Sequence, residues 1–371
     1  MNHNFGGDPF TIGIEEELML VDRETLDLAQ GVEAVLADVG DAADGDVKPE
    51  LMQSVLEIAT EPCPNVGAAG VQLGGLRSAV RAAAERAGML VGASGTHPSA
   101  LWEEQRIVDR PRYRALTAEL GYIARQELIF GTHVHVGVDG PDKAVYIADG
   151  LRRDLPLLLG LSANSPLWRG RVTGMMSSRT PVFRAFPRVG VPPHYGSWEI
   201  YERRVERMVS SGAISDYTYL WWDVRPHPNL GTVEVRVFDQ QTRLEHTIAL
   251  AAVVVTLVHR YASGFVEGQA LIEVPGELID DNKVRAALHG LEGELVDYRR
   301  GRNVATRELV ARLLDELAPH ADELGCASEL GAIRELIDAG TGARHQLDLL
   351  ERDGDLAALT RHLCKETAGA P

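Results

Sequence analysis

The sequence predicts an α+β protein in which an antiparallel β-sheet carries helices on its outer face. Up to about residue 240, short segments with period-2 alternation or many β-branched residues alternate with helical patterns and with loops rich in glycine and proline. Beyond that point nearly every segment has a helical pattern. We therefore expect a single domain over residues 1–371, with a sheet-rich part at about 10–240 and a helical part at about 245–368.

Composition indicates a soluble enzyme of small molecules. The 371 residues are 45% hydrophobic, and 37 Lys plus Arg against 54 Asp plus Glu give a net charge of -17. This acidity argues against binding to nucleic acid or to an anionic membrane. The three cysteines are widely spaced without a CxxC, so no disulfide framework or zinc knuckle is indicated. The chain shows no signal peptide, and its longest apolar run, Ile248–Val258, is too short to cross a bilayer, so we expect a cytoplasmic protein.

The secondary structure can be assigned in chain order. Strands are predicted over Thr11–Val21, Leu51–Thr60, Gly131–Val138 and Thr232–Asp239. Helices are predicted over Val66–Ala87, Asp142–Ser162, Trp198–Ser211 and several segments from Glu245 to Thr367. Long loops are predicted over Asp38–Lys48 and Gly170–Ser197. Loops of that length in a compact domain are usually functional or mobile.

The first strand carries three consecutive glutamates in an otherwise apolar segment, TIGIEEELMLVD. Because side chains alternate between the two faces of a strand, Glu15 and Glu17 share one face, and Glu16 lies on the other face with the apolar residues. Two carboxylates on one face repel each other unless a cation lies between them, and such oxygen ligands suit Mg²⁺ or Mn²⁺. The alternative interpretation is a strand face whose charges remain in water.

The third strand, GTHVHVGV, places His133 and His135 on one face and valines on the other. A His-x-His pair on a strand is a common way to direct two imidazoles at a metal or a substrate. The alternative is a polar sheet face whose histidines bind water or backbone. In the fourth strand Glu234 and Arg236 likewise share a face, although a cross-strand ion pair would give the same pattern.

The second strand contributes Glu57, which interrupts an apolar run. Glu50 is an odd number of residues away, so only a bulge or a bend could bring it to the same face, and we rank it lower. Charged or imidazole groups thus segregate to one face in four strands. That pattern is typical of an antiparallel sheet with a polar, metal-lined side and helices on its back.

Divalent ions clustered with arginines are what ATP and a phosphoryl group in transfer require. The sequence has no GxxxxGK[ST] motif, no GxGxxG after a strand and no HExxH. A nucleotide site in this chain must therefore be built from metal ions held on the sheet.

The chain resembles the carboxylate-amine ligases also called glutamate-cysteine ligase type 2. The resemblance runs from about Thr11 to Thr367, and it is carried by TIGIEEELMLVD, KPELMQSVLEIAT, GTHVHVGV, LSANSPLWRGRVTGMMSSR, WWDVRPHPNLGTVEVRVFDQQT, DNKVRAALHGLEGELVD and TGARHQ. It implies a curved antiparallel sheet of about six strands, similar to the catalytic domain of glutamine synthetase. It also implies ATP-dependent joining of a carboxylate to an amine, typically glutamate and cysteine, with Mg²⁺ or Mn²⁺.

The resemblance assigns roles residue by residue. It implies metal ligands at Glu15, Glu17, Glu57, His133 and Glu234, with Glu50 a weaker candidate. Arg236 and Arg179 match positions that contact the transferred phosphate, and these are the expected catalytic residues. Expected on the substrate side are His135, Ser178, Asn282 and Arg285. Lys283 stands where most relatives have an aromatic residue, which concerns only local packing or one substrate contact.

Two rival functions use the same residues. In a metal-dependent amidase, His133 and His135 would hold Zn²⁺ and activate water, although the many carboxylates favour Mg²⁺. A non-catalytic nucleotide or amino-acid sensor would bind ATP without turnover. The expected partners are ATP and amino acids, and the helix-rich carboxyl-terminal half is also compatible with a homodimer.

Two further segments border the expected site in sequence. The Gly170–Ser197 loop, with Ser177, Ser178 and Arg179, is the candidate lid that would exclude water from an acyl-phosphate; the alternative is a passive surface loop. Four aromatic residues within Tyr217–Trp222 could stack on adenine, but such a group is more often core or subunit interface.

Overall fold

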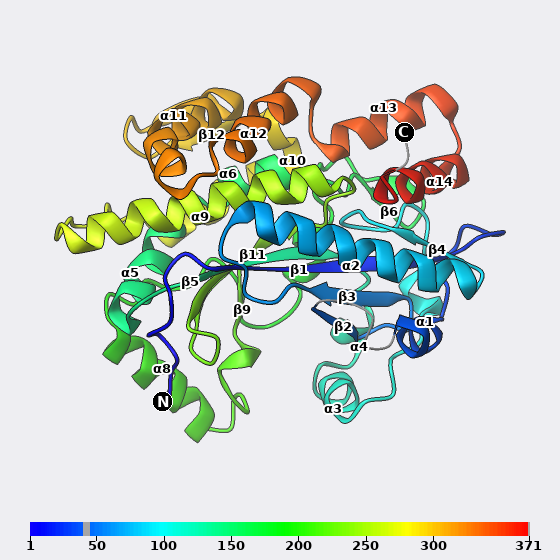
Figure 1. Ribbon diagram of the computed structural model, residues 1–371, viewed down its shortest axis with the longest axis horizontal. Helices are drawn as coiled ribbons and strands as arrows, with labels where there is room; N and C mark the ends of the chain where they lie inside the picture. Colours follow the sequence, from blue (N-terminus) through cyan, green and yellow to red (C-terminus); the bar gives the residue numbers. More distant parts are fainter. Residues whose placement is uncertain (40–44, 370–371) are drawn as a thin grey trace.

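The fold is organised around one antiparallel sheet of seven strands, in the order β10-β11-β5-β1-β3-β2, with β4 also pairing with β1. The computed structural model describes residues 1–39 and 45–369. The strands of this sheet are β1 (Ile12–Asp22), β2 (Asp46–Pro49), β3 (Val55–Ala59), β4 (Met89–Gly92), β5 (Gly131–Gly137), β10 (Val224–His227) and β11 (Thr232–Asp239). The expected α+β class with a large antiparallel sheet is confirmed, with seven strands where about six were expected (Figure 1).

The two faces of the central strand β1 lie in different environments, one in the hydrophobic core and one in a polar cavity. Ile12, Ile14, Leu18 and Leu20 are at most 1% exposed and belong to the main hydrophobic core. Glu15 and Glu17 alternate with them and line a cavity on the opposite face. The alternation predicted for this segment is therefore the one that the strand adopts.

Helices cover the apolar face of the sheet. Figure 1 shows α2 (Val66–Arg86) and α9 (Leu244–Val266) directly above the strands, and α5 (Pro141–Leu151) and α6 (Leu155–Ser162) also pack there. Helix α9 is long and apolar enough to cross a membrane by length and composition, but 72% of its most apolar window is buried in the protein. Its place is the core of the fold.

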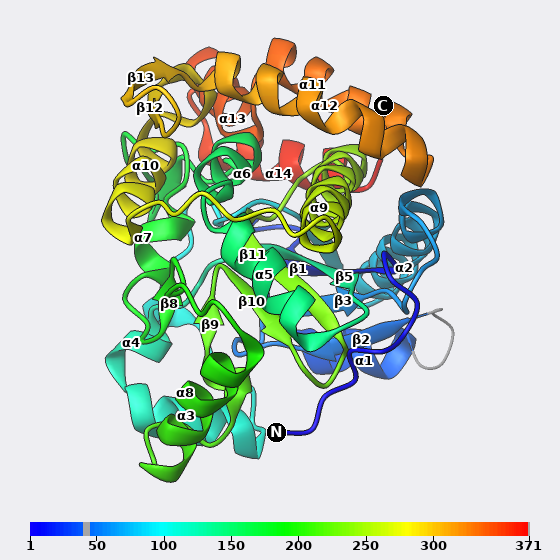
Figure 2. The same cartoon turned by 90° about the vertical axis from the view of Figure 1, so that its left-hand side faces the viewer.

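The remaining helices form an outer layer and the flanks of the polar face. The outer layer contains α10 (Gly276–His289), α11 (Thr306–Leu324), α12 (Ala327–Ala339), α13 (Gly342–Asp353) and α14 (Leu356–Thr367). Around the rest of the sheet lie α1 (Val32–Val39), α3 (Pro111–Leu120), α4 (Tyr122–Arg125), α7 (Arg179–Phe183) and α8 (Trp198–Ser210). Figure 2 shows α3 and α8 below the sheet, on the side away from α9. The largest hydrophobic cluster takes residues from both the sheet and the helical part.

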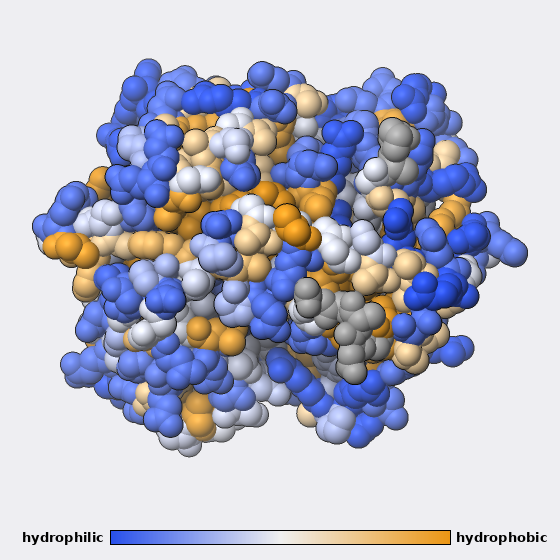
Figure 3. Space-filling model, in the orientation of Figure 1, coloured by the Kyte–Doolittle hydropathy of each residue, from blue (hydrophilic) through white to orange (hydrophobic). Residues whose placement is uncertain are grey.

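Three small two-stranded sheets lie outside the main sheet in the described chain. Strand β6 (Leu167–Trp168) pairs with β7 (Arg171–Val172), and β8 (Val189–Gly190) pairs with β9 (Trp221–Trp222). A hairpin of β12 (Glu294–Asp297) and β13 (Arg302–Ala305) joins α10 to α11. Space-filling colour in Figure 3 shows a mostly hydrophilic surface, with an apolar strip along α9.

Two predicted boundaries are wrong, each for a local reason. The helix expected over 142–162 is broken between α5 and α6, where Pro156 in the first turn of α6 cannot continue an earlier helix. The strand expected over 51–60 begins only at Val55, because residues 52–55 form a turn closed by the Val55 N–H and the Met52 carbonyl.

The two predicted loops also contain regular structure. Within 38–48, α1 extends to Val39 and β2 begins at Asp46, while residues 40–44 lie outside the described part of the chain. The 170–197 segment contains β7, α7 and β8. It is anchored to α10 by Arg184, whose guanidinium donates two hydrogen bonds of 2.8 Å to Asp280.

Candidate active site

A polar cavity of about 350 Å³ opens on the face of the sheet opposite α2 and α9. Strands β1, β2, β3, β5, β10 and β11 or the residues next to them supply most of its charged lining. The charged and imidazole side chains that line the cavity are Glu15, Glu17, Lys48, Glu50, Glu57, Arg112, Glu127, His133, His135, Arg225, His227, Glu234 and Arg236. A smaller cavity of about 40 Å³ shares Glu17, Glu50 and Arg236 with it and is also lined by Arg179.

One group of possible metal ligands consists of Glu15, His133 and Glu234, whose ligand atoms all lie within 4.8 Å of one another. Strand pairing produces this group, since Glu15 lies opposite His133 in the β1–β5 register. The Nδ1 atom of His133 is 3.0 Å from Glu15 Oε2, and its buried Nε2 atom has no hydrogen-bond partner among the described residues. Burial, with the charge of Arg236, lowers the pKa of His133 to about 4, so its imidazole is neutral and available as a ligand.

A second group consists of Glu17, Glu50 and Glu57, again within 4.8 Å. Glu17 lies directly opposite Glu57 in the β1–β3 register. Glu50 follows β2 at the turn into β3, which is the bend that its spacing from Glu57 required. Lys48, opposite Glu57 on β2, brings its Nζ to 2.7 Å from Glu57 Oε1.

The pKa values of the three carboxylates in this second group are raised, because the carboxylates are buried close together. Burial raises the pKa of Glu17 to about 7, and burial together with the charges of Glu57 and Glu17 raises the pKa of Glu50 well above its usual value. The pKa of Glu57 is also raised, mainly by burial and then by Glu15. A bound cation would neutralise the charge of these buried carboxylates, so the group is suited to binding a cation.

Two arginines hold Glu234 in its ionised form. Arg225 Nε lies 2.6 Å from Glu234 Oε2, and Arg236 Nη1 forms an ion pair with Glu234 Oε1. Burial acts to raise the pKa of Glu234, but the charges of Arg225 and Arg236 outweigh it and hold the pKa well below the usual range. The structure therefore places Arg236 at the cavity wall beside His133, where its Nη1 is 3.4 Å from His133 Nδ1.

Arg179 reaches the cavity because β5 leaves room for it. A Cβ atom on Gly131 would lie 2.5 Å from Arg179 Nη2, so the guanidinium passes over a residue that has no side chain. Asp239 holds the backbone around Arg179 in place. Its carboxylate accepts hydrogen bonds from the Ser165 and Ser177 hydroxyls at 2.7 and 2.8 Å. The Ser165 hydroxyl in turn accepts the Arg179 N–H at 3.1 Å. Asp239 is thus a positioning residue for Arg179.

An aromatic wall closes one side of the cavity. It consists of Phe183, Phe186, Tyr219 and Trp221. The rings of Phe186 and Trp221 meet edge to face at 5.8 Å. Of the other aromatic residues in this segment, Tyr217 is buried in a separate hydrophobic cluster and Trp222 packs against it, so the segment supplies both core and cavity wall.

Three residues expected on the substrate side do not line this cavity. Ser178 is 3% exposed and its hydroxyl lies 2.8 Å from that of Thr173. Asn282 makes two hydrogen bonds to the backbone of Val296, and Arg285 binds Asp281 and Asn303. Helix α10 belongs to the outer layer and not to the polar face of the sheet, so the structure does not bring Asn282 and Arg285 to this cavity.

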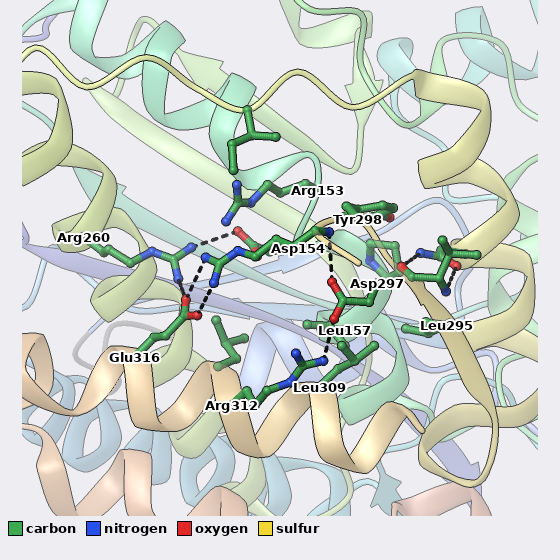
Figure 4. A pocket seen from close by; sticks show the side chains of 16 residues that line it. Arg153, Asp154, Leu157, Arg260, Leu295, Asp297, Tyr298, Leu309, Arg312 and Glu316 are labelled. Carbon is green, nitrogen blue, oxygen red and sulfur yellow. Dashed lines mark hydrogen bonds and ion pairs between the residues drawn. The ribbon is translucent and has the colours of Figure 1, made fainter. Parts of the chain in front are cut away.

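Asn282 instead borders a separate pocket of about 130 Å³, whose lining residues come from α6, α9, α10, α11 and the β12–β13 hairpin and include Tyr298 (Figure 4). Arg299, which also lines this pocket, donates there to Glu316. Lys283, on the same helix as Asn282, forms a buried ion pair with Asp223.

The structure adds residues that the sequence did not single out. Lys48 lies on the short strand β2, within the segment predicted as a loop over 38–48. Arg225 and His227 alternate on β10, whose sequence does not predict a strand because Pro226 and Pro228 interrupt the segment. Proline is tolerated there because β10 is the edge strand. Burial and the charge of Glu17 raise the pKa of Glu127, another new residue, to about 8. Its loop carries no sequence pattern that points to the cavity.

The geometry also bears on the zinc hydrolase. Neither group in the cavity combines His133 with His135. His135 Nδ1 is 3.0 Å from the Thr232 hydroxyl, and its Nε2 lies 3.4 Å from Glu15. Carboxylates dominate both groups, and this favours Mg²⁺ over Zn²⁺.

Comparison with known proteins identifies the family. The sequence model described as "Glutamate-cysteine ligase family 2(GCS2)" matches residues 11–364. The chain belongs to glutamate-cysteine ligase family 2. Two relatives within this family come from Rubrobacter xylanophilus. "Putative glutamate--cysteine ligase 2-3" is 43% identical over 370 residues, covering 99% of this chain and 100% of the relative. "Putative glutamate--cysteine ligase 2-1" is 40% identical over 367 residues, covering 98% and 96%.

Solved structures support the fold of this family 2 chain. A glutamate-cysteine ligase from Francisella tularensis, solved in complex with AMP, superposes with a TM-score of 0.72 at 14% sequence identity. The match covers 99% of this chain and 90% of that one. A bifunctional glutathione synthetase from Pasteurella multocida gives a TM-score of 0.65, with 97% of this chain and 53% of that one covered. At these identities the likeness concerns the fold.

Proposed function

We propose that this chain is an ATP-dependent ligase that joins glutamate to cysteine through an acyl-phosphate. The observation that carries the proposal is the convergence of six possible metal ligands and two arginines, Arg236 and Arg179, on one pair of connected cavities. Family membership supports the ligase class, and the names of the relatives suggest the substrates.

The donor atoms fit divalent magnesium. Five carboxylates and one neutral imidazole are mostly oxygen ligands, the buried Nε2 of His133 lacks a partner, and three of the carboxylates have raised pKa values. Mg²⁺, or Mn²⁺ in its place, would be held by Glu15, His133 and Glu234 and by Glu17, Glu50 and Glu57. When bound, it would neutralise charge on the phosphates of ATP.

The residues of the chain orient two successive displacements. In the first, a substrate carboxylate oxygen bonds to the γ-phosphorus of ATP, the bond to the bridging oxygen breaks, and ADP leaves. Arg236 and Arg179 offset the charge on the transferred group. In the second, the amine nitrogen bonds to the acyl carbon, and phosphate leaves with release of one proton. The aromatic wall around Tyr219 and Trp221 offers a stacking surface for adenine.

The 170–197 segment retains its proposed part in excluding water. Phe183 and Phe186, which belong to it, already line the cavity. Because an acyl-phosphate hydrolyses in water, covering the cavity would protect the intermediate. The ion pair between Arg184 and Asp280 would restrict how far this segment can move.

An ADP-release screen tests the proposal. The purified chain is given ATP and Mg²⁺ with glutamate and each amino acid in turn, and the amide product is identified by mass. Glutamate with hydroxylamine in place of the amine should yield a hydroxamate if an acyl-phosphate forms. Amide hydrolysis without nucleotide would point to the hydrolase. ATP-induced thermal stabilisation without ADP release from any pair would point to a sensor.

A further inference from the structure

A third group of possible metal ligands lies outside the acidic cavity, on the last two helices. His345 belongs to α13, and His362 and Glu366 lie one turn apart on α14. The two Nε2 atoms are 3.2 Å apart, and Glu366 Oε1 is 3.5 Å from His345 Nε2 and 3.4 Å from His362 Nε2. In Figure 1 both helices lie on the helical side of the sheet. None of the three residues lines the acidic cavity.

These three distances match the ligand spacing of a tetrahedral zinc ion. Zinc bonds of about 2.0–2.1 Å at tetrahedral angles place neighbouring ligand atoms about 3.3 Å apart. The three atoms form a nearly equilateral triangle with edges of 3.2, 3.4 and 3.5 Å. One point above that triangle therefore lies at a zinc bond length from all three atoms.

The donor chemistry differs from that of the cavity and favours a different metal. Two imidazole nitrogens and one carboxylate oxygen form a typical zinc set, whereas the cavity groups are rich in carboxylate. His246, at the start of α9, lines the same surface depression as His345 and Glu366. The depression is open to solvent, since His345 is 47% exposed and His362 34%.

We propose that His345, His362 and Glu366 form a Zn²⁺ site with an open fourth position, separate from the ligase site.

A second histidine pair in the described chain lacks this convergence. His259 and His320 lie beside Glu323, so the residue types are the same. His259, however, meets His320 through Nδ1 at 3.0 Å and Glu323 through Nε2 at 3.6 Å. The Nδ1 and Nε2 lone pairs of the His259 ring point in different directions. One metal ion therefore cannot bind His259, His320 and Glu323 together. His320 therefore provides a matched control.

Such an ion would link α13 to α14 near the start of α9. Arg243, the residue before α9, already lies 3.5 Å from Glu366. Gln346, next to His345, donates to Asn164 Oδ1 at 2.7 Å, and the Asn164 N–H donates to Asp239. The site thus lies on a segment that contacts the support of Arg179, although its proposed role in zinc binding does not depend on the ligase activity.

Zinc titration of the full chain in excess Mg²⁺ tests the site. After dialysis, bound zinc is counted by atomic absorption for the parent and for the variants His345→Gln, His362→Gln and His320→Gln. We expect the first two variants to bind one zinc fewer per chain than the parent, and His320→Gln to match the parent. Zinc should also raise the melting temperature of the parent and of His320→Gln, and the increase should be lost in the other two.

The outcomes are distinguishable from failure of the fold or of the proposed function. All three substituted residues are at least partly exposed or lie at the helix surface, and circular dichroism checks that each variant is folded. Equal zinc content in the parent and His345→Gln would overturn the proposal, because the three side chains would then be only a hydrogen-bonded group. Equal zinc loss in His320→Gln would overturn it as well, since the effect would not depend on convergence. Ligase activity enters neither readout.

Discussion

Glu17 and Glu57 lie directly opposite each other on neighbouring antiparallel strands, on the face of the sheet that forms the cavity. Like charges at opposed positions destabilise a sheet unless a cation separates them. Glu17→Gln should therefore reduce ATP turnover by about 100-fold or more, because a charge that positions the phosphates is lost. ADP release at saturating Mg²⁺ measures the effect.

Glu61, an exposed carboxylate just beyond β3, is the matched control. Glu61→Gln should leave turnover unchanged. The fold should tolerate Glu17→Gln well, and thermal stability without Mg²⁺ should rise or stay constant, since a repulsive charge is removed. Comparable turnover by Glu17→Gln and the parent would remove this carboxylate from the proposed site.

Gly131 and Arg179 make a second prediction possible. An alanine at 131 would bring Cβ to 2.5 Å from Arg179 Nη2 and displace the guanidinium. A misplacement of about 1 Å can cost about 100-fold in rate, so Gly131→Ala should lower kcat/KM for ATP by about that factor. Initial rates over a range of ATP concentrations provide the measurement.

Gly13, on the adjacent strand, offers a control of the same chemistry. A Cβ there would meet only His135 Cβ, at an ordinary 3.6 Å. Gly13→Ala should keep most of the activity. If both alanine variants lose activity equally, the loss comes from the strands and not from Arg179.

Local periodicity explains how much of the site could be predicted. Alternation along one strand is a property of a few neighbouring residues, so the common face of Glu15 with Glu17, of His133 with His135 and of Glu234 with Arg236 follows from the sequence. The large antiparallel sheet with helices on its back follows from the same segregation of polar and apolar residues. Both agree with the structure.

Positions set by tertiary packing could not be predicted in the same way. Glu127 sits in a loop without a pattern, and it reaches the cavity only because the chain leads from α4 into β5 there. Asn282 and Arg285 lie on α10, whose distance from the polar face depends on how the outer helices pack. The sequence marks Asp239 only as the end of a strand, and its hydrogen bonds with Ser165 and Ser177 join residues more than 60 positions apart.

Glu16, on the opposite face of β1, leads to a prediction about stability. It is fully buried and forms two hydrogen bonds of 2.7 Å with Arg77 on α2. Arg77→Met would leave a buried, unpaired carboxylate, which typically costs about 3–5 kcal/mol of unfolding free energy. The double variant Glu16→Leu with Arg77→Met should be more stable than Arg77→Met alone. Urea denaturation monitored by circular dichroism compares them.

An exposed pair provides the reference for this measurement. Arg86 and Asp38 are 60% and 41% exposed, so Arg86→Met should change the unfolding free energy by less than about 1 kcal/mol. A similar cost for Arg77→Met and Arg86→Met would show that burial of the Glu16 pair has no energetic consequence.

The buried side chain of His97 should make the unfolding free energy depend on pH. It is 2% exposed, its Nε2–H donates to the Leu26 carbonyl at 3.1 Å, and its Nδ1 accepts the N–H groups of Ser99 and Ala100. Burial lowers its pKa to about 4, below the unfolded value of about 6.5. The unfolded chain therefore binds the proton first, so the contribution of His97 to stability is full above pH 6.5 and is lost as the pH falls towards 4.

Comparison with His97→Asn isolates this contribution from that of the acidic cavity, whose raised carboxyl pKa values act in the opposite direction. Between pH 6.5 and 4, the unfolding free energy of the parent should fall more steeply than that of His97→Asn, by up to about 1.4 kcal/mol per pH unit. Asparagine retains an acceptor for the two backbone N–H groups but cannot titrate. Denaturation curves at several pH values give the slopes, and parallel slopes would mean that His97 does not protonate on unfolding in this range.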